Sequence, residues 1–329
     1  MPALQERCPP LHVQIRMDVA QKLKIALDET RMLILGAQVL LGFQMRSVFQ
    51  DAFEQLPAPS KIFDGVALLI MTAVVALLIA PAAHHRIVEE GNASRRIMRI
   101  ISLSMSGALL LFALALGINI FLGLERIAGL GVAITAGIAG AATAFLLWFG
   151  IEWAALMRKG RTDTNMKDQQ VPLAKKIDQM LTEARVILPG AQALLGFQLA
   201  VILTRAFEQL PGSSKAIHAV ALGLVALCTM LLMTPAAYHR IVYGGEEAEE
   251  FLILGGRFVM AATVALALGL AADVYVVIAK IAESDVIGTA AAALSLVALV
   301  GLWHVSPWYL RAQRKGAAGA LRDGLGSRR

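Results

Sequence analysis

The amino-acid sequence predicts an all-α membrane protein with eight transmembrane helices, arranged as two parallel four-helix repeats. Apolar residues make up 57% of the chain and charged residues only 16%, whereas a typical soluble domain has about 25% charged residues. The apolar residues cluster in windows of roughly 20, the length that crosses the hydrocarbon of a bilayer. An internal repeat divides these windows into two sets of four.

The repeat is a gapless match between the two halves of the chain at a single offset of 154 residues. The match includes Glu, Arg, Gln and His, so apolar composition does not explain it, and the chain is a tandem duplication. The matched motifs are E-x-R-x-x-x-x-G-A-Q-x-L-L-G-F-Q from Glu29 and Glu183, F-E-Q-L-P from Phe53 and Phe207, and P-A-A-x-H-R-I-V from Pro81 and Pro235.

The repeat and the charge pattern divide the chain into five segments. These are a tail with an amphipathic helix at 1–28, a first transmembrane repeat at 29–157, a linker with a second amphipathic helix at 158–182, a second transmembrane repeat at 183–310 and a basic tail at 311–329. Apolar residues every four positions, as at Val19, Leu23 and Leu27, indicate the amphipathic helices. Each of these helices lies on the membrane surface or packs on the cytoplasmic end of the bundle.

Each repeat contributes four expected spans. The first spans, about 32–53 and 186–207, contain Gln and Arg and are the least apolar. The second spans, about 62–83 and 216–237, are interpreted as apolar throughout. The third spans are about 100–122 and 254–278, and the fourth about 127–153 and 286–308.

The basic residues predict the orientation, because Lys and Arg favour cytoplasmic loops. With the N-terminus inside, the inner segments hold 24 of the 30 basic residues, whereas the outer loops hold Lys61, Arg126, Lys215 and Lys280. We therefore expect both termini in the cytoplasm. Four spans per repeat give both repeats the same orientation, so the repeats are parallel and not inverted.

Polar residues inside the expected spans are candidates for a functional or a structural role. The amides of Gln38, Gln192, Gln44 and Gln198 either hold neighbouring helices together or line a path for a solute or ion. Asp273 lies in a third span, and a carboxylate inside a membrane helix is a candidate functional site.

A second set of candidates lies at the expected cytoplasmic ends of the helices. His85, Arg86, His239 and Arg240 end the second spans, where they either anchor the helix or respond to pH and anionic lipid. The first and second spans are joined by a short loop, so their ends should be neighbours. We therefore expect Glu29 to pair with Arg86 and Glu183 to pair with Arg240, as a structural clamp in each repeat.

Several classes of function have no support in the sequence. It contains no H-E-x-x-H, no phosphate-binding Gly-rich loop before a Lys and no G-x-S-x-G, so we expect no enzymatic activity and no cofactor. The six His residues lack the spacing of a metal site, and Cys8 and Cys228 make no disulfide framework. The basic residues flank apolar blocks, which argues against nucleic-acid binding.

The repeated motifs resemble an uncharacterised family of bacterial multi-pass membrane proteins that usually carry one copy of the four-helix unit. The resemblance is carried by Glu29, Arg31, Gln38, Phe43, Pro81, His85 and Arg86 and by their counterparts in the second copy. It implies a location in the bacterial inner membrane. Similar proteins are sometimes labelled sodium/proton antiporters, but recognised antiporter folds have inverted repeats and buried paired carboxylates, which this sequence lacks.

Two functions follow as hypotheses. The first is a non-enzymatic membrane protein with a role in membrane-associated binding or in the cell envelope. The alternative is a transporter of a small ion or solute that uses the polar residues of the first spans. They differ in whether Gln38, Gln192 and Asp273 converge on one wet cavity. The expected partner is the bilayer, and anionic lipids at the cytoplasmic face and a second copy of the chain are further candidates.

Overall fold

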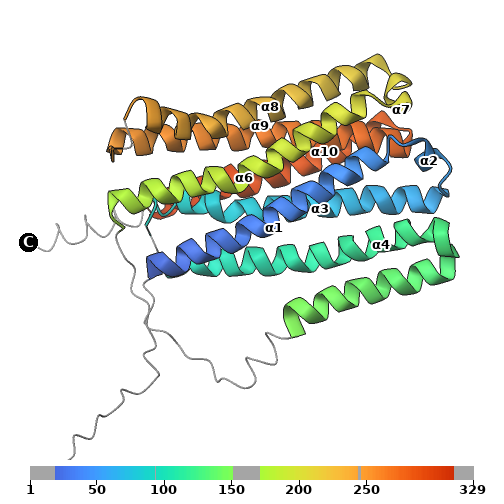
Figure 1. The fold of residues 1–329 in the computed structure, drawn as a ribbon, viewed down its shortest axis with the longest axis horizontal. Helices are drawn as coiled ribbons and strands as arrows, with labels where there is room; N and C mark the ends of the chain where they lie inside the picture. Colours follow the sequence, from blue (N-terminus) through green and yellow to red (C-terminus); the bar gives the residue numbers. More distant parts are fainter. Residues whose placement is uncertain (1–18, 93, 151–170, 244–245, 315–329) are drawn as a thin grey trace, which may run out of the picture.

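The structure, a computed structural model, describes residues 19–92, 94–150, 171–243 and 246–314. These residues form helices and the turns between them (Figure 1). The helices of the first half are α1 (Val19–Ser47), α2 (Asp51–Glu54), α3 (Ala58–Ile87), α4 (Arg95–Phe145) and η1 (Leu146–Gly150). Those of the second half are α6 (Leu173–Ile202), α7 (Arg205–Glu208), α8 (Gly212–Ile241), α9 (Glu249–Ala282), α10 (Asp285–Val300) and η2 (Gly301–Val305).

Seven helical segments in the described part of the chain are long and apolar enough to cross a membrane. They begin at Ala58, Arg95, Ile127, Leu173, Gly212, Glu249 and Asp285. The predicted all-α multi-pass architecture is therefore confirmed, but the predicted count of eight spans is not. The helix that falls short is α1, because Arg31, Gln38, Gln44 and Arg46 lower its mean hydropathy.

The expected amphipathic helices are not separate elements where the structure describes them. α1 continues without a break from Val19 through the segment predicted as the first span, and it ends at Ser47 instead of Phe53. α6 likewise runs from Leu173 to Ile202. The amphipathic pattern therefore belongs to the first turns of these two long helices. Residues 1–18 and most of the linker, 151–170, lie outside the described residues.

The third and fourth spans of each repeat form a hairpin around one residue with positive φ. In the first repeat, Gly129 has a φ of 79° and interrupts α4. The two arms of α4, Arg95–Glu125 and Ile127–Gly150, are each long and apolar enough to cross a membrane. In the second repeat the residue at the same repeat position is Glu283, which ends α9 at φ 50°. The two residues differ in ψ, which is 169° at Gly129 and 35° at Glu283, so the hairpins turn at the same repeat position with different backbone conformations. The conformation of Gly129 is one that essentially only glycine adopts, whereas Glu283 lies in the left-handed helical region.

The two repeats run in the same direction through the bundle. α1 and α6 start at one end and lie side by side, and α2 and α7 mark the other end, called here the α2 end (Figure 1). α3 and α8 then return toward the end at which α1 starts, called here the α1-start end. This arrangement agrees with parallel repeats, in which the first helices pack against each other.

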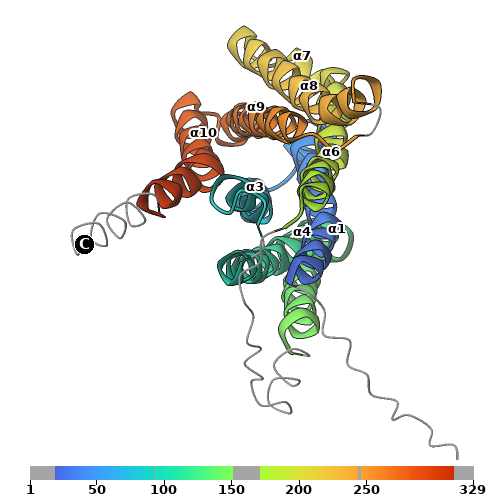
Figure 2. The same cartoon turned by 90° about the vertical axis from the view of Figure 1, so that its left-hand side faces the viewer.

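The repeats nevertheless occupy different environments. The apolar window of α3 is 67% buried, whereas that of its counterpart α8 is 33% buried. The window of α9 is 72% buried, whereas that of the first arm of α4, its counterpart, is 22% buried. α3 and α9 pack against each other between α8 and the second arm of α4, which lie at opposite margins (Figure 2). A two-fold arrangement would give counterpart helices equal burial, so the packing is asymmetric.

The seam between α1 and α6 shows the same asymmetry at residue level. Gln38 of α1 is fully buried against Gly190 of α6, where a Cβ would lie 2.9 Å from the Gln38 Cβ. The repeat-equivalent pair, Gln192 and Gly36, does not meet, because both residues are exposed and nothing lies within 4 Å of a Cβ at Gly36. Small residues permit such close helix approach in a membrane. Of the two equivalent glycines, Gly190 lies at such a contact and Gly36 does not.

Candidate functional site

A buried ion cluster joins the two repeats at the α1-start end. Glu183 of α6 accepts a hydrogen bond from the Arg86 guanidinium of α3 and lies 2.9 Å from the His85 Nδ1. The Glu183 side chain is 3% exposed and that of Arg86 is 15% exposed. Arg86 also donates to the Gly256 carbonyl oxygen of α9 at 3.5 Å. The cluster therefore fastens α3 of the first repeat to α6 and α9 of the second.

The expected pairing inside each repeat is wrong. Among the described residues no ion pair joins Glu29 to Arg86 or Glu183 to Arg240. Glu29 and Arg240 are exposed, and the His239 ring stacks on Phe251 with centroids 4.5 Å apart. The reason is the asymmetric packing, which brings α3 to α6 but leaves α8 at the margin of the bundle.

A second polar cluster, the closed site, lies in the second repeat, near the α2 end of the bundle. It consists of Gln198, His218 and Asp273. The Gln198 amide donates to Asp273 Oδ2 at 2.6 Å, and His218 Nδ1 lies 3.7 Å from Asp273 Oδ1. The other imidazole nitrogen of His218 contacts the Gln198 carbonyl oxygen at 3.1 Å. All three side chains are buried, and the cavity beside them measures only about 10 Å³. The polar groups of the closed site therefore largely satisfy one another.

The same three positions of the first repeat, together with Ser47, form the open site. Subtracting the offset of 154 from Gln198, His218 and Asp273 gives Gln44, Asp64 and Asn119. With Ser47 these side chains line a pocket of about 420 Å³ between α1, α2, α3 and α4. Ser47 donates to Asp64 Oδ1 at 3.5 Å, whereas Asp64 Oδ2 and both amide atoms of Gln44 have no hydrogen-bond partner among the described residues.

The asymmetric packing explains why one site is closed and the other is open. Met45 and Phe49, from the end of α1 and the turn after it, are buried and line the cavity of the closed site. Their repeat counterparts, Leu199 and Leu203, are 51% and 88% exposed and do not cover the open site. The first repeat therefore closes the site of the second repeat, but the second does not close that of the first.

The polar residues singled out in the sequence do not converge on one cavity. Gln38 is buried against Gly190, Gln192 is exposed, and Asp273 belongs to the closed site. Gln44 and Gln198 lie in separate sites, one in each repeat. Among the described residues no group of three His, Cys, Asp or Glu side chains could hold a metal ion.

Two residues of these sites were missed by the sequence interpretation. The interpretation of the second spans as apolar throughout is wrong, because Asp64 and His218 lie in them. The most apolar 18-residue window of α3 has a mean hydropathy of 2.6, so the run of apolar residues dominates the span and a single carboxylate near one end does not stand out. The signal that could have found them is the repeat itself, because both occupy the same repeat position and both are polar.

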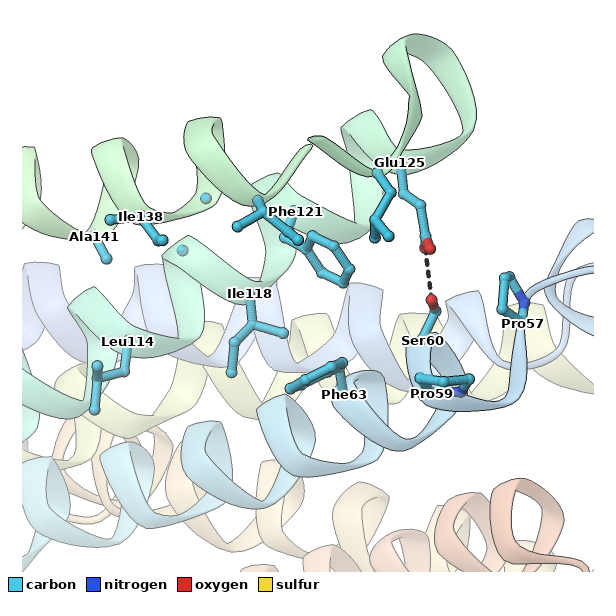
Figure 3. A pocket seen from close by; sticks show the side chains of 14 residues that line it. Pro57, Pro59, Ser60, Phe63, Leu114, Ile118, Phe121, Glu125, Ile138 and Ala141 are labelled. Carbon is cyan, nitrogen blue, oxygen red and sulfur yellow. Dashed lines mark hydrogen bonds between the residues drawn. The ribbon is translucent and has the colours of Figure 1, made fainter. Parts of the chain in front are cut away.

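A larger pocket, of about 540 Å³, lies between the start of α3 and the two arms of α4 (Figure 3). Its walls are apolar, with Phe63, Ile118 and Phe121 among the side chains drawn. Its polar side chains are Ser60 and Glu125, which hydrogen-bond to each other at 2.6 Å. Apart from these two side chains, the residues that line this pocket offer a ligand only apolar contact.

Comparisons with known proteins agree with the duplication. Two segments, residues 17–152 and 167–307, each match the family of unknown function DUF6328. Nothing among curated proteins and solved structures matches the chain. The two matched segments correspond to the two four-helix repeats and together cover most of the chain. The chain is therefore a multi-pass membrane protein that belongs to the DUF6328 family and carries its unit twice.

Proposed function

We propose that this protein is a non-enzymatic protein of the bacterial inner membrane that binds a small solute in the open site and does not carry it across. The observation that supports binding is the open site itself, a pocket of about 420 Å³ in which polar atoms of Gln44 and Asp64 have no hydrogen-bond partner among the residues that the structure describes. Pockets of roughly 300–1,000 Å³ with a few convergent polar groups are typical of small-molecule sites.

The buried side chains between the open site and the α1-start end favour binding without transport. The Asp64 end of α3 and the Arg86 end are separated by a run of buried apolar side chains that includes Leu68, Met71, Val75 and Ile79. On α1, Gln38 is buried in close contact with α6. The Glu183 cluster then fastens the repeats at the α1-start end. A polar solute would meet an apolar barrier, which is costly to enter.

The proposal includes an orientation and an eighth span. α1 has 29 residues and lies beside α6, its repeat counterpart. α6 is long and apolar enough to cross a membrane, with a mean hydropathy of 1.5 in its most apolar window. Two of the polar residues of α1, Gln38 and Gln44, are buried and therefore do not face lipid. The distribution of basic residues favours a cytoplasmic location of both termini, and with that orientation the open site would face the outside.

Access to the two sites from outside tests this proposal. The pair Gly123→Cys and Val277→Cys, one residue per repeat at the same offset, is matched. Gly123 is exposed, lines the open site and has nothing within 4 Å of a Cβ, whereas Val277 is 2% exposed and lines the closed site. In a chain without Cys8 and Cys228, a membrane-impermeant maleimide added outside should label Gly123→Cys much faster than Val277→Cys. Absence of labelling at Gly123→Cys would refute an externally accessible open site.

The second candidate function is transport, favoured by the buried carboxylate of Asp273 beside the His218 imidazole. Ionisable groups in membrane helices often mark ion or proton pathways. Purified protein in liposomes under a pH or sodium gradient should give no flux above that of empty vesicles if the protein only binds. Flux that is lost in Asp273→Asn would instead favour the transporter and contradict binding without transport.

A further inference from the structure

We propose that the ligand of the open site is a small organic ammonium ion with an apolar substituent, whose charged nitrogen is held by Asp64. This inference rests on the proposed binding function and names the chemical class of the ligand. The observations that carry it are the charge content of the two equivalent sites, the walls of the pocket and the polar atoms that have no hydrogen-bond partner in the described part of the chain.

The charge content of the two sites differs by one basic group. The closed site contains one acidic side chain, Asp273, and one basic side chain, His218, within 3.7 Å of each other. In the open site the His position is occupied by Asp64 and the Asp position by Asn119, so the carboxylate is kept but the base is absent. An unpaired buried carboxylate is costly. A cationic ligand would supply the charge that His218 can supply in the second repeat.

Neighbouring cationic side chains of the protein do not fill this role. Asp64 is 5% exposed, and none of the ion pairs in the described part of the chain includes it. Lys61 lies one turn earlier on α3, but its ammonium group lies over the Phe53 ring, 5.9 Å from the centroid. Lys280 pairs with Glu54 at 3.4 Å, and Arg46 of α1 is exposed. No ion pair in the described part of the chain therefore compensates an Asp64 carboxylate, and a cationic ligand could do so.

The unpartnered atoms suit an N–H donor. Asp64 Oδ2 and Gln44 Oε1 are buried acceptors without a hydrogen bond among the described residues, and both residues line the pocket. An alkylammonium group carries several N–H donors and no acceptor, so it matches the two oxygen acceptors, although it offers no partner to the Gln44 Nε2 donor. Charge-assisted hydrogen bonds of this kind are about twice as strong as neutral ones.

The size and walls of the pocket favour an organic cation over a bare metal ion. A volume of about 420 Å³ is far larger than one ion requires. Apolar side chains of Leu40, Phe43, Phe53, Leu56 and Leu122 form much of the wall. Burial of apolar surface contributes roughly 25 cal/mol per Å², so an alkyl substituent would add affinity.

Protection of a cysteine in the pocket tests the ligand class. The labelling rate of Gly123→Cys, in the chain without Cys8 and Cys228, is measured in membranes with hexylammonium chloride, sodium chloride or 1-hexanol. Hexylammonium should slow labelling several-fold in a saturable way. Sodium should not, because it lacks N–H donors and apolar surface, and neither should hexanol, because it lacks the charge.

Two variants of the site provide the controls. Asp64→Asn keeps the shape and removes the charge, so the half-protecting concentration of hexylammonium should rise by about tenfold or more. The double change Asp64→His with Asn119→Asp rebuilds in the first repeat the residues of the closed site, and it should abolish protection while the protein keeps its thermal stability. Both variants are first checked for an unchanged labelling rate without ligand.

The possible results distinguish a failure of the proposed binding function from a failure of the ammonium assignment alone. If Gly123→Cys is not labelled at all, the open site is not accessible, and the binding function fails together with this inference. If it is labelled but hexylammonium gives no protection, or hexanol or sodium protects equally well, only the ammonium assignment is wrong. Protection that persists unchanged in Asp64→Asn would also overturn it.

Discussion

Replacing Glu183 by glutamine is expected to lower the free energy of unfolding by about 3 kcal/mol. Glu183 is 3% exposed and faces both His85 and Arg86, so the substitution leaves the Arg86 guanidinium largely buried without its counter-charge. Removing one partner of a buried pair is more damaging than removing both, because the remaining charge is not compensated. The measurement is reversible unfolding in mixed micelles of detergent and denaturing surfactant.

The repeat provides a matched control for this prediction. Glu29 is the counterpart of Glu183 at the same offset, but it is exposed and has no ion pair with Arg86. Glu29→Gln should change the free energy of unfolding by less than about 0.5 kcal/mol, as surface substitutions usually do. Equal losses in the two variants would mean that each repeat has its own clamp, as the sequence alone had suggested.

Much of the fold could be predicted from the sequence, because it depends on local patterns. Apolar windows predict membrane helices, and the match from Glu29 onto Glu183 predicts two units of the same orientation. These signals require no knowledge of packing. The exception is α1, where Gln38 and Gln44 reduce the hydropathy although both are buried inside the bundle. Hydropathy measures composition and cannot distinguish a polar residue that faces lipid from one that faces another helix.

The candidate site could be predicted only in part. Gln44, Gln198 and Asp273 were expected to be important and do belong to the two sites. Asp64 and His218 were missed, because one polar residue in an apolar span hardly changes its average. The partner of Arg86 was also wrong. The sequence assigns Glu29 and Glu183 equal roles, and only the packing of α3 against α6 and α9 decides which of them is buried.

We expect one pair of introduced cysteines to cross-link α1 to α6 and the repeat-equivalent pair to form no cross-link. A disulfide requires Cβ atoms about 3.5–4.5 Å apart. A Cβ at Gly190 would lie 2.9 Å from that of Gln38, so a small shift allows Gln38→Cys and Gly190→Cys to join. The counterpart pair, Gly36→Cys and Gln192→Cys, has exposed positions on both helices and nothing within 4 Å of a Cβ at Gly36.

This comparison tests most directly the claim that duplicated repeats pack asymmetrically and so produce one open and one closed site. Both pairs are placed in the chain without Cys8 and Cys228 and oxidised in native membranes, and the disulfide is detected by its effect on electrophoretic mobility. We predict that the Gln38–Gly190 pair forms the disulfide and that the Gly36–Gln192 pair does not. Equal cross-linking of the two pairs would mean that α1 and α6 are related by a two-fold axis, and it would contradict the asymmetric arrangement.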